Sequence, residues 1–174
     1  EGMGLVCKAL NLKKNDEIIT VSNSFIATCG ALAYYGCKPI LVDVGNDLNI
    51  DYYKILNKIS KNTKAIMPVH LSGIPFDVEK IKKICKNNNL YFIEDAAHAF
   101  GAKFRNKNIG TFGDVGIFSL HPRKNFHVLG DGGLITTNNK NLYKKILLLR
   151  NHGLINRDKS VVWGTNSRLD NFQA

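Results

Sequence analysis

The sequence predicts an α/β protein with a mostly parallel sheet and helices on both faces. Short apolar runs of the kind found in buried strands alternate along the chain with amphipathic, helix-like segments. An apolar fraction of 44% and a charged fraction of 22% are typical of a soluble globular protein. No apolar run reaches the roughly 18 residues of a membrane span, so no contact with a membrane is expected. Ligands of such sheets bind at the carboxyl ends of the strands, and the residues there are the candidate site.

The elements follow one another in a regular order. We expect a helix at 2–11, a strand at 17–21, a buried helix at 25–35 that ends at Gly36, a strand at 39–44, a helix at 51–59 and a strand at 65–70. Asp77 is a suitable N-cap for the next helix, in which the apolar positions 78, 81, 84 and 85 share one face. Strands at 90–93, 115–120 and 134–137 and a helix at 141–150 complete the pattern. We therefore expect residues 1–150 to form one domain, followed by a less regular segment, 151–174.

The ends and the charge of the chain allow further expectations. Both ends interrupt what look like structural elements and no signal peptide is visible, so we expect a part of a longer protein. The four cysteines have no CxxC spacing, which favours free thiols in a reducing compartment such as the cytoplasm. The net charge of +10 has three interpretations: a solvated lysine-rich surface, which we favour, attraction of an anionic substrate, or nucleic-acid binding. No basic run interleaved with aromatic residues supports the third, so no nucleic-acid partner is expected.

Several common site motifs are absent. The chain has no GxxxxGK[ST] phosphate loop and no GxSxG nucleophile elbow. The glycine-rich stretch 130–133 precedes a strand rather than linking a strand to a helix, which argues against a dinucleotide fingerprint. The five histidines lack HExxH or other metal-ligand spacing, so no metal site is expected.

The remaining candidates suit pyridoxal phosphate (PLP). That cofactor needs an amine for a Schiff base, a carboxylate to keep its ring nitrogen protonated, hydroxyls for its phosphate and a flat or small apolar neighbour for its ring. Lys124, Asp95, Ser119 and Phe25 could meet these needs in turn. Taken singly, each has an ordinary alternative: a surface lysine, a capping aspartate, a serine of no special role and a core phenylalanine. Their order and spacing, not the individual residues, favour a PLP site.

The order of motifs resembles a known family. The segments 93–102, 110–125 and 130–136, together with shorter matches at 23–28, 68–73, 150–153 and 164–169, are similar to the DegT/StrS-type sugar aminotransferases. The resemblance covers essentially the whole chain. It implies the large, PLP-binding domain of the type I (aspartate aminotransferase) fold, with 151–174 crossing towards a small domain. The family's Ser-Gly-Thr phosphate-binding turn would end just before Glu1, so the complete site is expected to need residues beyond both ends.

The resemblance also implies roles for individual residues. Lys124 would form the Schiff base and then move the proton between the substrate carbon and the cofactor carbon, and Asp95 would hold the pyridinium nitrogen. The remaining positions would contact the ring hydroxyl (His98), the two faces of the ring (Phe25 and Ala97), the phosphate (Ser119) and the site of a neighbouring subunit (Asn166). The last role implies a homodimer with shared active sites.

The implied reaction has two halves. An amino donor, expected to be glutamate, gives its amino group to the cofactor, and a nucleotide-linked keto sugar accepts it, in amino-sugar or surface polysaccharide synthesis. Relatives that dehydrate sugars carry histidine at the lysine position, so Lys124 favours transamination. The alternatives are a type I PLP enzyme acting on a non-nucleotide ketone such as an aminocyclitol precursor, a catalytically silent PLP-binding regulatory relative, and a DNA-binding module.

Overall fold

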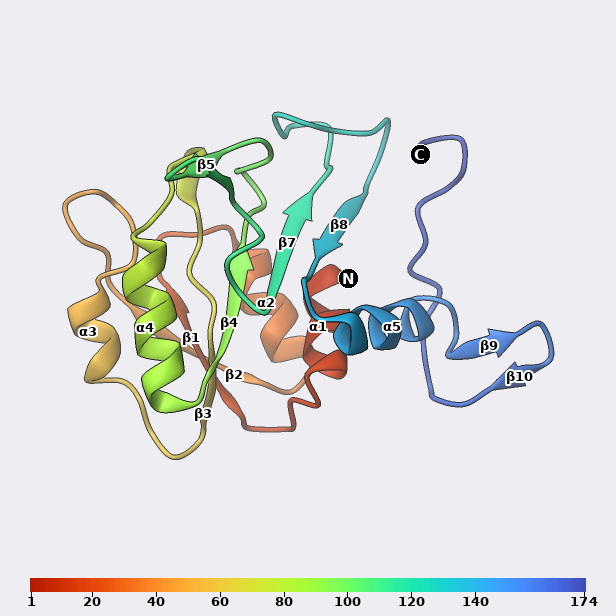
Figure 1. Ribbon diagram of the computed structural model, residues 1–174, viewed down its shortest axis with the longest axis horizontal. Helices are drawn as coiled ribbons and strands as arrows, with labels where there is room; N and C mark the ends of the chain where they lie inside the picture. Colours follow the sequence, from red (N-terminus) through yellow and green to blue (C-terminus); the bar gives the residue numbers. More distant parts are fainter.

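The computed structural model describes residues 1–174 and confirms the predicted α/β architecture (Figure 1). A six-stranded sheet has the order β2-β1-β3-β4-β7-β8. Its strands are β1 (Glu17–Val21), β2 (Lys38–Val42), β3 (Thr63–Ile66), β4 (Tyr91–Asp95), β7 (Val115–Ser119) and β8 (Gly133–Thr136). Neighbouring strands are parallel except for the pair β7 and β8, which is antiparallel. The carboxyl ends of five parallel strands therefore lie along one edge, at the top of Figure 1.

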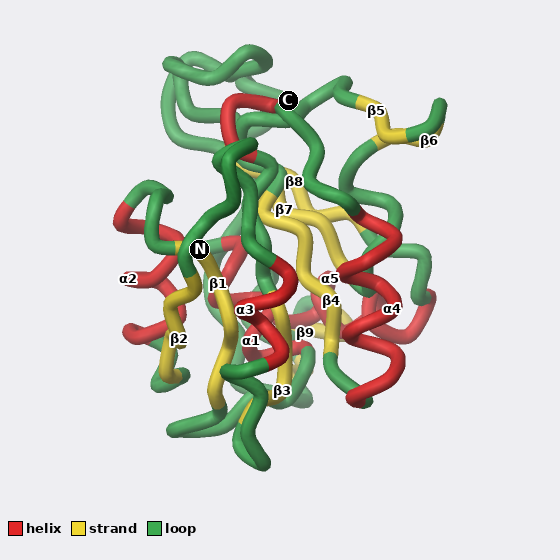
Figure 2. The backbone as a smooth tube through the Cα atoms, turned by 90° about the vertical axis from the view of Figure 1, so that its left-hand side faces the viewer, coloured by secondary structure: helices red, strands yellow, loops and turns green.

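Helices cover both faces of this sheet, to the left and to the right of the strands in Figure 1, and Figure 2 is seen from the left-hand side. On one face lie α1 (Gly2–Ala9), α2 (Ile26–Tyr34) and α5 (Lys140–Leu149), which contribute to a core of 16 buried residues. On the other face, α3 (Tyr52–Leu56) and α4 (Val78–Asn88) contribute to a second core of the same size. Successive residues of a strand point to opposite faces, so each central strand contributes to both cores.

Local signals account for the boundaries of α4. The carboxylate of Asp77 accepts a hydrogen bond from the backbone amide of Lys80 at 3.2 Å, which confirms the predicted N-cap. The helix ends at Asn89, whose φ of 53° is the left-handed conformation common at helix ends. Val78, Ile81 and Cys85 are buried, and Ile84 is partly buried on the same core, as their spacing predicts.

The prediction of a buried helix at 25–35 is only partly right. The helix is present, but only Thr28 and Leu32 are buried, and Tyr34 is 85% exposed. An apolar composition without a polar face does not say which side of a helix another part of the chain covers. The outward face of α2 is consequently an uncovered apolar surface.

The residues after α5 are less regular, as expected. Two short strands, β9 (Leu154–Asn156) and β10 (Lys159–Ser160), pair as a hairpin that projects away from the sheet in Figure 1. Trp163, directly after this hairpin, is 93% exposed. Two further two-residue strands, β5 (Lys103–Phe104) and β6 (Lys107–Asn108), and a 3-10 turn at Leu71–Gly73 complete the structure.

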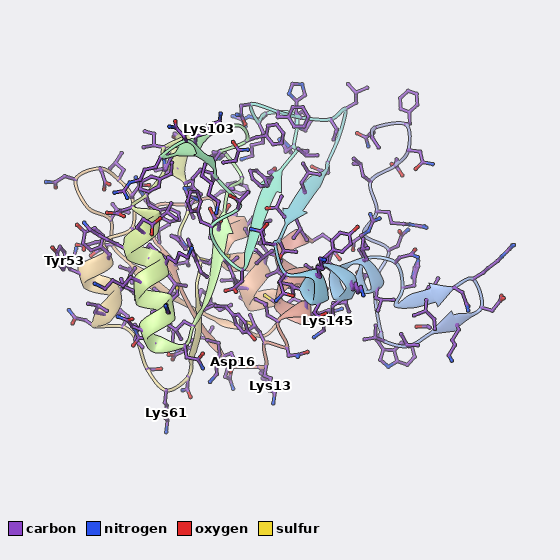
Figure 3. All side chains as sticks on the ribbon, viewed as in Figure 1. Lys13, Asp16, Tyr53, Lys61, Lys103 and Lys145 are labelled. Atoms are coloured by element: carbon purple, nitrogen blue, oxygen red, sulfur yellow. The ribbon has the colours of Figure 1, made fainter.

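Cysteines and lysines lie where the composition suggests. All four cysteines are free, and Cys7, Cys37 and Cys85 are buried. The side chains of Lys13, Lys61, Lys103 and Lys145 extend outward from the ribbon in Figure 3, in keeping with a solvated basic surface. None of the helices combines the length and the apolar character that a membrane crossing requires.

Candidate active site

The centre of the candidate site is Asp95, the last residue of β4. The segment that follows β3 holds its backbone by two hydrogen bonds. The amide of Asp95 donates to the carbonyl of Pro68 at 3.1 Å, and its carbonyl accepts from the amide of His70 at 3.0 Å. Its side chain is only 2% exposed. The carboxylate accepts one hydrogen bond from the hydroxyl of Thr28 at 3.0 Å and one from the amide of Ala97 at 3.2 Å. Asp95 is therefore a rigid, buried carboxylate at the carboxyl edge of the sheet.

Thr28 has a role that the sequence did not reveal. It lies in the first turn of α2, and its hydroxyl is also 2.8 Å from the hydroxyl of Ser24. If Thr28 donates to Asp95, Ser24 donates to Thr28 and the three groups form a chain. The helix thus reaches across to orient a carboxylate on β4. Phe25 is one turn away, since its carbonyl accepts from the amide of Thr28 at 3.0 Å, and its ring is 70% exposed at the start of α2.

The carboxylate of Asp95 has no cationic partner of its own. Burial, the largest influence, raises its pKa, and the hydrogen bonds from Ala97 and Thr28 and the nearby histidines only partly oppose this rise. No lysine or arginine forms an ion pair with it. A buried carboxylate without a cation is costly unless a ligand supplies the charge. A protonated pyridine nitrogen has the charge and the donor that this site lacks, so the residues present fit PLP.

Lys124 lies on the segment that leaves β7 at the same edge, and its side chain is half-buried. Its backbone amide donates to the carbonyl of His121 at 2.9 Å. The next residue, Asn125, donates from its side chain to the carbonyl of Phe100 at 2.9 Å. The ring of Phe126 stacks on that of Phe100, with centroids 4.1 Å apart. These contacts fasten the lysine segment to the turn that follows Asp95.

His98 connects the two predicted key residues. Burial, the largest influence, and then the nearby Lys124 ammonium lower its pKa, while Asp95 acts in the opposite direction. Lys124 and Asp95 therefore both lie close enough to affect the charge of His98. The Nδ1 atom of His98 accepts from the backbone amide of Ser72 at 3.3 Å, so the neutral ring carries its hydrogen on Nε2. The structure places Asp95, His98 and Lys124 at one edge of the sheet, with His98 near both of the others.

The other predicted residues differ in their placement. Ala97 is half-buried in the turn after β4, and Ser119 is half-buried at the end of β7, where its oxygen accepts from the amide of His121 at 3.3 Å. The hydroxyl hydrogen of Ser119 is thus available to a ligand. Asn166 is exposed, pairs with Asn151 just beyond α5 and accepts from the guanidinium of Arg168 at 2.9 Å. No contact joins Asn166 to the group around Asp95.

Asp95→Asn is expected to stabilise the cofactor-free protein by about 1 kcal/mol at pH 7, within the range of single stabilising substitutions. Because the pKa of Asp95 is raised on folding, the folded state binds its proton more tightly than the unfolded state. The resulting loss of stability therefore begins above the unfolded pKa and is complete above the raised folded pKa. Urea denaturation should show the gain at pH 7 and its disappearance below about pH 3.8, the usual aspartate value. A less stable asparagine variant at pH 7 would contradict this assignment.

The carboxyl edge of this parallel sheet carries a lysine, a histidine and a buried aspartate that has no cationic partner. These are the groups that PLP-dependent aminotransferases use to hold their cofactor. The model of the DegT/DnrJ/EryC1/StrS aminotransferase family matches residues 1–174, and the chain belongs to that family. PLP is the cofactor of these aminotransferases, and one structural neighbour contains the cofactor in its amino form, PMP.

Three relatives illustrate the similarity. A dTDP-3-amino-3,6-dideoxy-alpha-D-galactopyranose transaminase of Aneurinibacillus thermoaerophilus is 43% identical, over 100% of this chain and 48% of its own length. The crystal structure of S. venezuelae DesV has a TM-score of 0.95 at 34% identity, over 99% of this chain and 47% of DesV. The PMP-bound NtdA of Bacillus subtilis has a TM-score of 0.92 at 37% identity, over 99% of this chain and 40% of NtdA. The chain thus spans about half the length of the relatives it matches.

Proposed function

We propose that the protein to which residues 1–174 belong is a PLP-dependent aminotransferase that transfers an amino group from glutamate to a nucleotide-linked keto sugar, in the cytoplasm, for amino-sugar or surface polysaccharide synthesis. The observation that carries the proposal is the buried Asp95 carboxylate, which has no cationic protein partner and lies near His98, itself close to Lys124. Several relatives are named as enzymes of dTDP-, GDP- and UDP-linked sugars, which supports a nucleotide-linked sugar as the substrate.

The cofactor, when bound, supplies an electron sink for the carbanion that forms at the substrate carbon. In this proposal Asp95 binds the ring nitrogen and keeps a proton on it, because a carboxylate favours the charged form of its neighbour. The Nε2 hydrogen of His98 is available to the ring hydroxyl. Phe25 and Ala97 cover the two faces of the ring, and Ser119 donates to the phosphate.

Lys124 has two tasks in the proposed reaction. Its amine would hold the cofactor covalently, and once displaced by the amine of the substrate, its Nζ would move a proton between the substrate carbon and the cofactor carbon. The half-buried position of Lys124, fastened by Asn125 and Phe126, limits the motion of this amine to the neighbourhood of Asp95 and His98. Such restriction favours proton transfer over a short, fixed path.

The proposal includes a domain organisation and a dimer. Residues 1–150 would be the PLP-binding large domain, and 151–174 would cross towards a small domain. The exposed apolar side chains of Ile26, Tyr34 and Trp163 support a covering partner, which we take to be a second subunit. Asn166 would then serve the active site of that subunit, which is consistent with its distance from the contacts around Asp95.

A substrate panel tests the proposed reaction. The full-length protein, loaded with PLP, is incubated with glutamate and either dTDP-, GDP- or UDP-linked keto sugars or free cyclitol ketones, and aminated products are measured by mass spectrometry. We expect amine transfer to at least one nucleotide-linked sugar, at a rate of about 1 s⁻¹ or more. Transfer to a cyclitol ketone alone would favour the aminocyclitol alternative. PLP binding without transfer to any ketone would favour a regulatory relative.

A further inference from the structure

Glu94, the residue before Asp95 on β4, points to the opposite face of the sheet. Asp95 faces α2 through Thr28, whereas the side chain of Glu94 contacts the turn at 110–113 beside the other core. This follows from the alternation of side chains along a strand. Glu94 is fully buried, with no exposed surface. It can therefore influence a ligand beside Asp95 through the main chain that the two residues share and through its charge, but not by contact.

The carboxylate of Glu94 is completely satisfied by hydrogen bonds. One oxygen accepts from the amides of Phe112 and Gly113, both at 2.8 Å. The other accepts from the amide of Gly110 at 2.9 Å and lies 3.2 Å from Nε2 of His70. Burial alone would raise the pKa of Glu94, but the bonds from His70, Gly113 and Gly110 outweigh it, so that the pKa is lowered. Glu94 is accordingly an ionised carboxylate inside the protein.

His70 connects Glu94 to Asp95. Its ring is fully buried, stacks on Phe76 with centroids 4.0 Å apart, and must carry a hydrogen on Nε2 to bond to Glu94. Its backbone amide donates to the carbonyl of Asp95 at 3.0 Å, and the preceding residue, Val69, forms a parallel bridge with Asp95. One residue thus holds Glu94 by its side chain and Asp95 by its main chain.

The turn held by Glu94 leads directly into β7, at whose end Ser119 and the Lys124 segment begin. Gly113 has no room for a side chain, since a Cβ there would lie 2.5 Å from the carbonyl oxygen of Phe92. The amide of Asp114 donates to that same carbonyl at 2.8 Å. The Glu94 carboxylate therefore joins the segment after β3, the end of β4 and the turn that enters β7.

A buried ionic group of this kind is a poor source of stability, because apolar side chains of similar volume would fill the space at lower cost. His70 also leaves its Nδ1 atom buried without a partner, which adds to the cost. The cost of this buried pair has a reason if its hydrogen bonds fix the position of the main chain more strictly than apolar packing would. The residue whose main chain it holds is Asp95.

We infer that Glu94 and His70 form a positioning pair that acts from the far face of the sheet and holds the main chain of Asp95 so that its carboxylate meets the ring nitrogen of PLP. Neither residue touches the cofactor. This inference rests on the proposed function, because it takes from it the role of Asp95. It predicts that breaking the pair disturbs the ring nitrogen without removing any group that contacts the cofactor.

The test uses Glu94→Gln in the full-length protein. A glutamine has one acceptor oxygen, and its NH₂ group would face hydrogen-bond donors from the turn or from His70, so the arrangement cannot be kept. We expect PLP to bind roughly tenfold more weakly, as is usual when a supporting hydrogen bond behind a ligand is lost. With PLP labelled by ¹⁵N in the ring, we expect the NMR signal of the bound cofactor to move towards that of the unprotonated nitrogen.

Glu17→Gln is the matched control. Glu17 is also a buried, hydrogen-bonded glutamate, with Ser60 Oγ at 2.5 Å and Lys38 Nζ at 3.3 Å, but it lies at the amino end of β1, the opposite edge of the sheet. Its substitution should lower stability and leave the ring-nitrogen signal unchanged. Should Glu94→Gln fail to fold, His70→Gln, which keeps a donor for Glu94 but loses the ring, provides the same comparison with a smaller expected shift.

Four outcomes decide between these interpretations. A ring-nitrogen shift and weaker binding in the Glu94 or His70 variant, absent in the Glu17 variant, support the positioning pair. Parental affinity and an unchanged signal in a folded Glu94 or His70 variant overturn it, as do equal effects in the Glu17 variant, which would show a general loss of stability. Failure of the parental protein to bind PLP at all would overturn the proposed function and this inference together.

Discussion

Replacing Lys124 with alanine is expected to lower the rate of amino transfer by a factor of about 10⁴ or more, the upper range for loss of a positioned acid–base group. Alanine removes both the amine that holds the cofactor and the base that moves the proton. Lys124 is the one lysine that affects the pKa of His98, and no lysine affects that of Asp95, so no second lysine contributes to the site. Little of the lost function can therefore be replaced from within this chain.

The experiment should measure the covalent attachment of PLP to Lys124 separately from the rate of amino transfer. The PLP-loaded full-length protein is treated with borohydride, digested and analysed by mass spectrometry, which should place the reduced cofactor on the peptide that contains Lys124. The matched control is Lys103→Ala, since Lys103 is exposed on the short strand β5 and should not affect either readout. Cofactor fixed to another lysine, or a Lys124→Ala variant with near-parental turnover, would contradict the proposed role.

The positions of Asp95 and Lys124 could be predicted because each follows a recognisable local pattern. Asp95 ends an apolar run of strand-like residues, and the ligand edge of a parallel sheet is defined by such ends. Lys124 follows the next long apolar run, which became β7. The apolar run before Asp95 therefore indicated its place at the ligand edge, and the resemblance to a family supplied the roles of both residues.

Thr28 could not be predicted in the same way, because its function depends on a contact across 67 positions of the chain. In the sequence it is one small polar residue within an apolar helix, where most threonines have no special role. The role of Glu94 could not be predicted either. In the sequence it is simply a second carboxylate beside Asp95 at the end of a strand. Only the fold shows that the two point to opposite faces and that His70 joins them.

The helix α2 shows the limit of composition as a guide to burial. Its residues are apolar enough for a core helix, yet Ile26 and Tyr34 are exposed. The hydrophobic effect requires that such a surface be covered, but it does not specify by what. The sequence does not show what covers the apolar surface of α2. We expect the proposed second subunit to cover it.

Asp95→Asn is expected to slow amino transfer by about 10² to 10³-fold, the usual effect of losing one preorganised electrostatic group. Asparagine has the shape of aspartate and can still accept from the amide of Ala97, while its NH₂ group can donate to the hydroxyl of Thr28. The substitution therefore removes charge with little change in structure. The ring nitrogen would lose the neighbour that favours its protonated form, and the ring would accept electrons less readily.

Single-turnover reaction of the PLP-loaded variant with glutamate, followed by absorbance, measures this loss without interference from the sugar half of the reaction. PLP affinity should fall by about tenfold, at least as much as in Glu94→Gln, because the ring nitrogen loses its charged partner. The contacts to the phosphate and to Lys124 keep the cofactor bound. A cofactor analogue methylated on the ring nitrogen is permanently cationic, so it should restore part of the rate in Asp95→Asn. Near-parental rates with unmodified PLP would contradict the proposed role of Asp95.

Asp95→Asn is expected to raise the stability of the cofactor-free protein and to lower the rate of the loaded protein. Because these two effects are opposite, measuring both distinguishes a loss of charge from a damaged fold. The cofactor-free variant should be more stable than the parent at pH 7, because an ionised carboxylate no longer has to be buried. The loaded variant should be slower, because that same charge is what the ring nitrogen requires. A substitution that merely damaged the fold would lower both stability and rate. Greater stability with a lower rate would therefore identify Asp95 as a residue kept for its charge, at a cost that only the bound cofactor offsets.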